Sequence, residues 1–209
     1  FTLLGSDIDG EATGDGSGQS VSLSSNGTRV AIGAPSNVGN GNNSGHVRIY
    51  DYNGSAWVQA GGDINGEAQS DSSGHSVSLS SDGSRVAIGA IYNDGNGANS
   101  GHVRIYDYNG SAWVQVGGDI DGEASGDNSG SDVSLSSDGL SVAIGATLND
   151  GNGNNSGYVR IYDYNGSAWV QVGGDIDGEA QSDYSGYSVS LSSDGSRVAI
   201  GAPSNDCLL

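Results

Sequence analysis

The chain has little or none of several residue types that mark protein classes. Among its 209 residues there is no Met and no Lys, and there are only one Phe, two Pro and one Cys. The single cysteine, Cys207, excludes an internal disulfide framework. No segment approaches the ~20 consecutive apolar residues that a membrane-spanning helix needs. The residues present therefore predict neither a disulfide-stapled domain nor a membrane span.

Positive charge is also scarce. Six basic residues, all of them Arg, stand against 25 acidic ones, which gives a formal net charge of −19 at pH 7. A surface this acidic repels the phosphates of nucleic acid, so nucleic acid is excluded as a partner. Such a surface is suited to an extracellular environment that is rich in salt or calcium.

Two further features bear on location. The sequence begins at Phe1 with no targeting segment, so we expect its start to be processed or cut from something longer. A chain rich in Asn, Gly and Ser produces N-x-S/T sequons by chance, but their number here favours secretion. The candidate glycosylation sites are Asn26, Asn42, Asn53, Asn109, Asn154 and Asn165. We predict an extracellular or cell-surface protein.

A repeat of 56 residues runs through the whole chain. Trp57, Trp113 and Trp169 share one repeat position, and SGHVRIYDYNGSAWVQ at 44–59 recurs at 100–115. A third copy carries Tyr158 in place of His. The repeat predicts order in spite of a composition close to that of disordered chains. We interpret 1–209 as one array of about 3.7 repeats. Its approximate units are 1–19, 20–75, 76–131, 132–187 and 188–209.

One unit predicts four β-strands. Alternating β-branched residues and frequent Gly favour strands over helix. The expected strands are Ser76–Ser80, Arg85–Ala90, His102–Tyr108 and Ala112–Val116. Asp-Gly and Asn-Gly turns close the hairpins, and the small residues of RVAIGA would let a neighbouring sheet approach closely. Four antiparallel strands in a repeat of this length predict an all-β fold of propeller-type blades. A β-solenoid and a β-sandwich are the alternatives.

The residues also resemble a known family. GHSVSLSSDGSRVAIGA at 74–90 is similar to the FG-GAP repeat of integrin-α-type propellers, whose pattern is FGxSV…DGxxxxxVGAP. Ser-Gly stands here where that family has Phe-Gly, and Gly-Ala-Pro occurs at 33–35 and 201–203. VRIYD at 103–107 also resembles WD-repeat blades. Both resemblances imply a β-propeller.

The resemblance implies calcium in a loop between the first two strands of a blade. The family's loop is rich in Asp, whereas Ser81-Asp82-Gly83-Ser84 has one carboxylate. Calcium at the family's usual place is therefore in doubt.

Acidic residues cluster instead in the links between units, with alternate side chains that could supply oxygen ligands to calcium. The candidates are Asp7, Asp9, Glu11 and Asp15; Asp63, Asn65, Glu67 and Asp71; Asp119, Asp121, Glu123 and Asp127; and Asp175, Asp177, Glu179 and Asp183. The alternative is a structural turn in which Asp caps backbone N–H groups.

Other candidate sites are weaker. The Asn/Asp/Gly loops, such as Asn93–Ser100, could bind glycan or cation but read better as connections. Tyr106, Tyr108 and Trp113 could stack on a sugar or cover the flank of a blade. His46 and His102 share a repeat position that Tyr158 also occupies, so a ligand role common to all repeats is excluded and a surface location is expected.

No Ser-His-Asp or Cys-His set recurs, and paired carboxylates in every unit indicate structure rather than catalysis. We therefore predict a non-enzymatic extracellular structural or adhesion protein. Four units would need more residues than the chain has, so we expect either a longer repeat chain or self-association through open strand edges. Cys207-Leu208-Leu209 break the repeat and are a candidate contact. The alternative is a calcium-dependent propeller module that binds a glycan or a cell-surface protein.

Overall fold

The computed structural model describes residues 2–205. Cys207, Leu208 and Leu209, predicted as a contact, lie outside the described residues. Strands, turns and bends make up the described part, which contains no helix. No helix that could cross a membrane is therefore found there.

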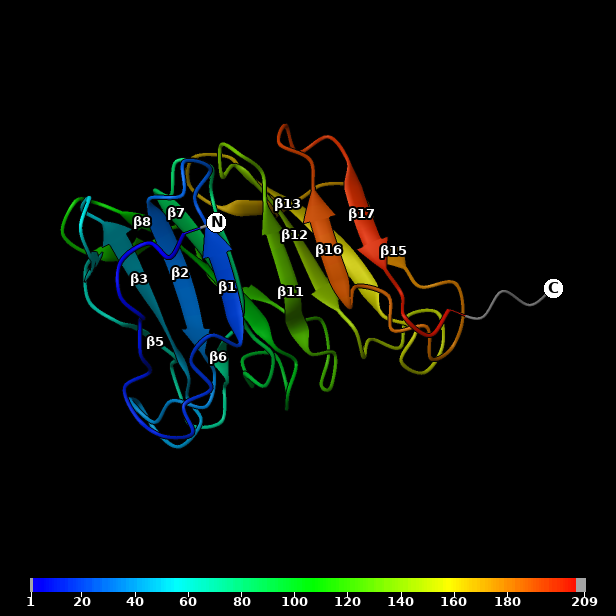
Figure 1. The fold of residues 1–209 in the computed structure, drawn as a ribbon. Helices are drawn as coiled ribbons and strands as arrows, with labels where there is room; N and C mark the ends of the chain where they lie inside the picture. Colours follow the sequence, from blue (N-terminus) through cyan, green and yellow to red (C-terminus); the bar gives the residue numbers. More distant parts are fainter. Residues whose placement is uncertain (1, 206–209) are drawn as a thin grey trace.

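Four antiparallel sheets stand side by side (Figure 1). Sheet 1 consists of β1 (Ser20–Leu23), β2 (Arg29–Ala34), β3 (His46–Tyr52), β4 (Trp57–Gln59) and β5 (Ile64–Asn65). Sheet 2 consists of β6 (Ser73–Leu79), β7 (Arg85–Ala90), β8 (His102–Tyr108), β9 (Trp113–Gln115) and β10 (Ile120–Asp121). Sheet 3 consists of β11 (Ser129–Leu135), β12 (Ser141–Ala146), β13 (Tyr158–Tyr164), β14 (Trp169–Gln171) and β15 (Ile176–Asp177). Sheet 4 is the hairpin of β16 (Ser188–Leu191) and β17 (Val198–Gly201).

The predicted all-β blades are confirmed. β7 and β8 have the predicted bounds, while β6 begins earlier, at Ser73, because a bulge between Ser73 and Ser76 extends its pairing with β7. The links add a fifth short strand to each of the first three sheets, which the prediction of four strands did not include. Ile120 pairs with Val103, so β10 continues the outer edge that β9 begins. The reason is apolar burial, since Ile120 is only 6% exposed.

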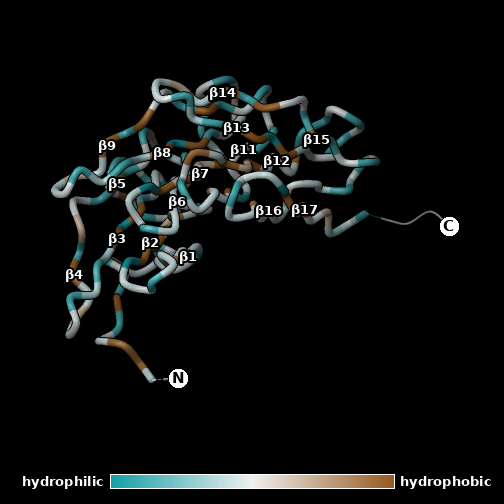
Figure 2. The backbone as a smooth tube through the Cα atoms, turned by 90° about the horizontal axis from the view of Figure 1, so that it is seen from above, coloured by the Kyte–Doolittle hydropathy of each residue, from teal (hydrophilic) through white to brown (hydrophobic). Residues whose placement is uncertain are grey.

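The sheets fan out in an arc (Figure 2). The first strands, β1, β6, β11 and β16, lie toward the inside, and β4, β9 and β14 lie on the outside. Each first strand contacts the first strand of the next sheet. This is the arrangement of consecutive propeller-type blades.

The core lies between the sheets. One cluster joins Val47 and Ile49 of sheet 1 to Val77 and Leu79 of sheet 2. A second cluster of the same kind joins sheets 2 and 3. Every residue of β7 is buried because neighbouring sheets cover sheet 2 on both faces. A single sheet of this repeat therefore depends on its neighbours for burial of its apolar side chains.

Glycine permits the close approach expected for the RVAIGA strand. A Cβ added at Gly89 would lie 2.2 Å from the carbonyl oxygen of Gly130 in the next sheet. The Gly33 and Gly145 positions meet Gly74 and Gly186 in the same way. Only glycine fits where these strands cross.

The aromatic side chains cover the flanks of the sheets. Trp113 packs against the core cluster between sheets 1 and 2, and its Nε1 donates a 2.8 Å hydrogen bond to the carbonyl oxygen of Ala60 in sheet 1. Its ring centroid lies 5.1 Å from that of Tyr108. Trp113 thus joins two sheets, in agreement with the flank interpretation.

Candidate functional site

The last acidic residue of each link fastens the link to an Asn/Asp/Gly loop. Asp71 is 3% exposed. Its carboxylate accepts hydrogen bonds from the backbone N–H of Ala68 and from Asn93 Nδ2. The same contacts recur at the other copies of this position, which are Asp15, Asp127 and Asp183. These four carboxylates act as structural caps, which is the alternative interpretation of the links.

In the first three links, the Glu faces an Arg on the third strand of the following sheet. Glu67 Oε1 lies 3.2 Å from Arg104 Nη1, and Glu11 Oε1 lies 3.8 Å from Arg48 Nη1. Glu123 contacts Arg160 in the third copy. In the first two copies the other carboxylate oxygen of the Glu points toward a histidine.

The first Asp of the next link completes the group. His102 Nδ1 lies 4.0 Å from Glu67 Oε2 and 4.0 Å from Asp119 Oδ2. Glu11, His46 and Asp63 form the equivalent group one repeat earlier, with His46 Nδ1 3.7 Å from Glu11 Oε2. In each group the candidate ligand atoms lie within 4.8 Å of one another, so the group could hold a metal ion.

The structure therefore joins candidate residues of successive links. No three acidic side chains of one link come this close within residues 2–205. The other candidates lie exposed along the links, and Asp9 and Asn65 accept hydrogen bonds from Arg48 and Arg104 through their backbone carbonyls. The exposed remainder are Asp7, Asp121, Asp177 and Glu179.

The expected surface location of the histidines is wrong for His46 and His102, which are each 1% exposed. Both begin the third strand of their sheet, where the two flanking links cover the ring. Burial, together with a smaller effect of the neighbouring Arg104, lowers the pKa of His102 to about 4. Neither Nδ1 atom has a hydrogen-bond partner among the described residues. Tyr158 occupies the same repeat position in the third copy and is also 1% exposed. The replacement of one ring by another at this position was the sequence signal that it is buried.

In the third copy of this group, an arginine binds both carboxylates. Arg160 donates from Nε and Nη2 to the two carboxylate oxygens of Asp175, at 2.7 and 2.8 Å, and also contacts Glu123. Its guanidinium carbon lies 4.6 Å from the centroid of the Tyr158 ring. With Tyr in place of His, arginine joins the two carboxylates.

The loop where the FG-GAP resemblance implies calcium does not fit that ion. Asp82 Oδ1 accepts hydrogen bonds from Ser80 Oγ and from the N–H and Oγ of Ser84. The carbonyl oxygen of Gly83 accepts a bond from Arg29. One carboxylate, already bonded within its own turn, cannot supply the six to eight oxygens that calcium takes.

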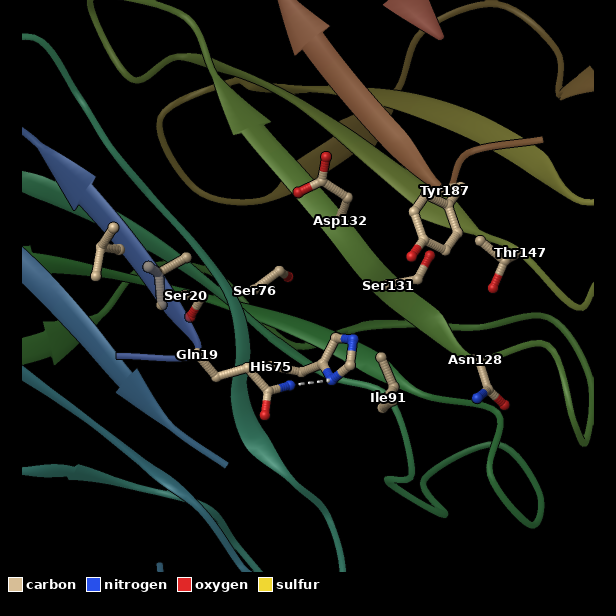
Figure 3. A pocket seen from close by; sticks show the side chains of 12 residues that line it. Gln19, Ser20, His75, Ser76, Ile91, Asn128, Ser131, Asp132, Thr147 and Tyr187 are labelled. Carbon is tan, nitrogen blue, oxygen red and sulfur yellow. Dashed lines mark hydrogen bonds between the residues drawn. The ribbon is translucent and has the colours of Figure 1, made fainter. Parts of the chain in front are cut away.

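A cavity of about 420 Å³ lies along the inner strands (Figure 3). On one side of it, Gln19 Nε2 and His75 Nδ1 form a 3.3 Å hydrogen bond, and Asp132 and Tyr187 line it from sheets 3 and 4. Gln19, His75, Ser131 and Tyr187 are four different residues at one repeat position. The otherwise similar repeats thus differ at the cavity wall.

Comparison with known proteins agrees with this architecture. Residues 65–106, which run from the end of β5 into β8, match the family model described as FG-GAP repeat. These residues are thus similar to an FG-GAP repeat. The match confirms the FG-GAP resemblance over these residues, and the 56-residue period places similar units on both sides. No curated protein matches the chain in sequence.

Two solved structures share the fold at 13% sequence identity. Hydrazine synthase of Kuenenia stuttgartiensis aligns with a TM-score of 0.56 over 95% of this chain and 44% of that chain. A protein of Bacteroides uniformis assigned as a 6-phosphogluconolactonase aligns with a TM-score of 0.58 over 87% of this chain and 46% of that chain. This chain thus spans less than half of either structure, and the likeness shows the fold alone.

Proposed function

We propose that the FG-GAP array is a non-enzymatic, extracellular structural module that self-associates by docking the sheet of a second copy onto each exposed end face. The family is built from repeats, and the acidic groups of this chain recur from unit to unit. A repeated group suits a structural role, because a catalytic pair is needed only once.

One comparison within the chain carries the proposal. Val21 and Leu23 of sheet 1 are 63% and 57% exposed. Val77 and Leu79, at the same repeat position in sheet 2, are 9% and 7% exposed because sheet 1 covers them. The face of sheet 1 therefore has the residues that accept a neighbouring sheet of this repeat.

Near the opposite end of the arc, sheet 4 is only a hairpin, and it leaves part of sheet 3 uncovered. Ile176 is 39% exposed, whereas Ile64 and Ile120 at the same repeat position are each 6% exposed under the following sheet. We infer that the first-strand face of sheet 1 and the uncovered part of sheet 3 in another copy can pack as successive blades do. Contact between them is head-to-tail, which lets copies add in series.

Sedimentation velocity over a range of protein concentration tests the proposal. We expect the mass of the wild type to rise with concentration and V21D to stay monomeric, because a charge on this face opposes burial. Val114 is 50% exposed on the outer strand β9, so V114D is the matched control and should assemble like the wild type. A monomeric wild type at millimolar concentration, or assembly of V21D equal to that of the wild type, would contradict the proposal.

Exposure of the sequons supports an extracellular location. All six sequon asparagines are exposed. Asn53, Asn109 and Asn165 accept hydrogen bonds through Oδ1 from the serine two residues later. Their Nδ2 atoms, which would carry a glycan, make no hydrogen bond within residues 2–205.

The varied cavity wall favours a second candidate function, binding of a glycan at the inner strands. Amide, carboxylate, imidazole and phenol groups meet there, and such groups bind sugar hydroxyls and stack on sugar rings. Calorimetric titration with oligosaccharides, with and without calcium, would show heat that Y187S reduces. Ser131 is the natural residue at that repeat position, so this variant is expected to fold. Absence of binding heat for all sugars would contradict glycan binding and leave the structural role as the proposed function.

A further inference from the structure

The two Glu–His–Asp groups have a property that the structural proposal does not use. His102 is 1% exposed, yet its Nδ1 has no hydrogen-bond partner among the described residues. A buried polar atom without a partner destabilises the fold, because the hydrogen bonds it made to water are not replaced. His46 repeats the situation one unit earlier, with both ring nitrogens unpartnered. A missing partner at two equivalent places indicates that a ligand completes them.

The carboxylates around His102 are each held by one oxygen. Gln115 Nε2 donates a 2.6 Å hydrogen bond to Asp119 Oδ1, and Arg104 Nη1 lies 3.2 Å from Glu67 Oε1. The second oxygen of each carboxylate, Asp119 Oδ2 and Glu67 Oε2, faces His102 Nδ1. In the first group, Gln59 holds Asp63 in the same way at 2.7 Å. Outer contacts of this kind orient metal ligands.

The spacing fits a small metal ion. A distance of 4.0 Å separates His102 Nδ1 from each facing carboxylate oxygen. Tetrahedral Zn²⁺ has bonds of about 2.0 Å to nitrogen and carboxylate oxygen, which places its ligand atoms about 3.3 Å apart. Each carboxylate oxygen would therefore move toward the imidazole by less than about 1 Å when the ion binds. Glu67 and Asp119 are 46% and 33% exposed, so an ion can enter from solvent and the side chains can adjust.

The donor set also selects the kind of metal. Imidazole with carboxylates suits Zn²⁺ and similar first-row ions, whereas Ca²⁺ takes oxygen ligands only and needs six or more. Three protein ligands leave one position of a tetrahedral ion for water.

The third repeat provides an internal comparison. Glu123 and Asp175 keep both carboxylates, but Tyr158 replaces the imidazole. There the Arg160 guanidinium reaches both carboxylates, at 2.7 and 2.8 Å from the oxygens of Asp175. A cation thus joins this pair of carboxylates in the copy that lacks histidine.

We propose that Glu11–His46–Asp63 and Glu67–His102–Asp119 are two binding sites for a divalent transition-metal ion such as Zn²⁺. Each ion would connect the link that enters a sheet to the third strand and the outer edge of that sheet. A metal ion that binds only the folded chain stabilises the folded state. The two ions would therefore hold the links and the sheets together.

Zn²⁺ calorimetry on the full chain tests the proposal, in a C207S background so that the thiol binds no metal. We expect two ions per chain for the parent, one each for H46Y and H102Y, and none for the double variant. Tyr is the natural residue at this position of the third repeat, so these variants should fold. H75Q is the matched control and should keep two ions, because Gln19 occupies the same repeat position and His75 lies outside both groups.

Two further measurements secure the result. D119N removes one ligand oxygen but keeps the oxygen that Gln115 holds, and it should weaken one of the two sites at least tenfold. Co²⁺ should give visible absorption bands that H46Y and H102Y each halve. An unchanged ion count in the double variant, or displacement of Zn²⁺ by equimolar Ca²⁺, would overturn the proposal.

Discussion

Arg85 Nη1 donates a 2.9 Å hydrogen bond to the carbonyl oxygen of Gly139, which lies in the first hairpin turn of the next sheet. The same guanidinium donates two bonds to Asp107 in its own sheet, at 2.6 and 2.7 Å. It also lies 5.1 Å from the ring centroid of Tyr164 in the next sheet. One buried cation thus joins two blades, and Arg29 repeats the arrangement between sheets 1 and 2.

Replacement of this arginine should loosen the contact between sheets 2 and 3. We expect R85S to lower the free energy of unfolding by about 1–3 kcal/mol, because it removes charge-assisted hydrogen bonds and a cation–π contact. Ser141 stands at this position in sheet 3 and bonds Asp163 at 2.6 Å, so serine fits the backbone. Urea denaturation measures the loss. The control is R197S: Arg197 is exposed in sheet 4, and its change should stay within about 0.5 kcal/mol.

The glycine contact between sheets gives a second prediction. G89A should destabilise the fold by about 3 kcal/mol, because the new Cβ would lie 2.2 Å from the Gly130 oxygen and the sheets would have to separate. Gly201 holds the same repeat position in sheet 4, where an added Cβ meets only Ser188 of its own hairpin. G201A should therefore cost much less in thermal unfolding. Equal losses for the two variants would show that backbone entropy, not the inter-sheet contact, dominates.

The strands could be predicted because the sequence features that form them lie within each strand and its adjoining turns. Alternation of Val103 and Ile105 with polar residues defines β8, and the Asn109-Gly110 turn ends it, so its predicted bounds agree with the structure. The RVAIGA strand was equally clear. Repetition then fixed the way the sheets stack, because equivalent sequences take equivalent environments.

The candidate site was only partly predictable because it joins residues of different repeats. Glu67 and Asp119 are 52 positions apart, and no spacing within one link shows that they meet at His102. The burial of His102 depends on how links pass over a neighbouring strand. Asp71 was proposed as a calcium ligand, but its partner, Asn93, lies in a loop whose position the sequence does not reveal.

The exposed sequons give a third prediction. Expression through a eukaryotic secretory pathway should add N-linked glycan, because the six asparagines are accessible in turns and loops. Mass spectrometry before and after enzymatic deglycosylation gives the occupancy. N109Q should lose one glycan, while N96Q, at an exposed asparagine outside any sequon, should lose none. A secreted protein of unmodified mass would contradict this prediction.

Acid should weaken the fold through the hairpin turns. Partial burial pushes the pKa of Asp82 upward, but hydrogen bonds from Ser84 and Ser80 outweigh it and hold the pKa below its ordinary value. The side chain of Ser136 lowers the pKa of Asp138 in the same way. A carboxylate with a depressed pKa stabilises the fold above its unfolded pKa, about 3.9, and this contribution is lost as pH falls through the folded pKa.

The first repeat supplies the matched variant for this effect. Asn26 occupies the Asp82 position, and its Oδ1 accepts the same three bonds, from Ser24 and Thr28. D82N should therefore keep the turn but lose its titration. Urea denaturation from pH 6 to pH 2 should show a smaller fall in unfolding free energy for D82N than for the wild type, by about 0.5 kcal/mol because solvent screens this exposed carboxylate. Identical pH profiles for the two proteins would mean that the turn carboxylates do not set the acid stability of the fold.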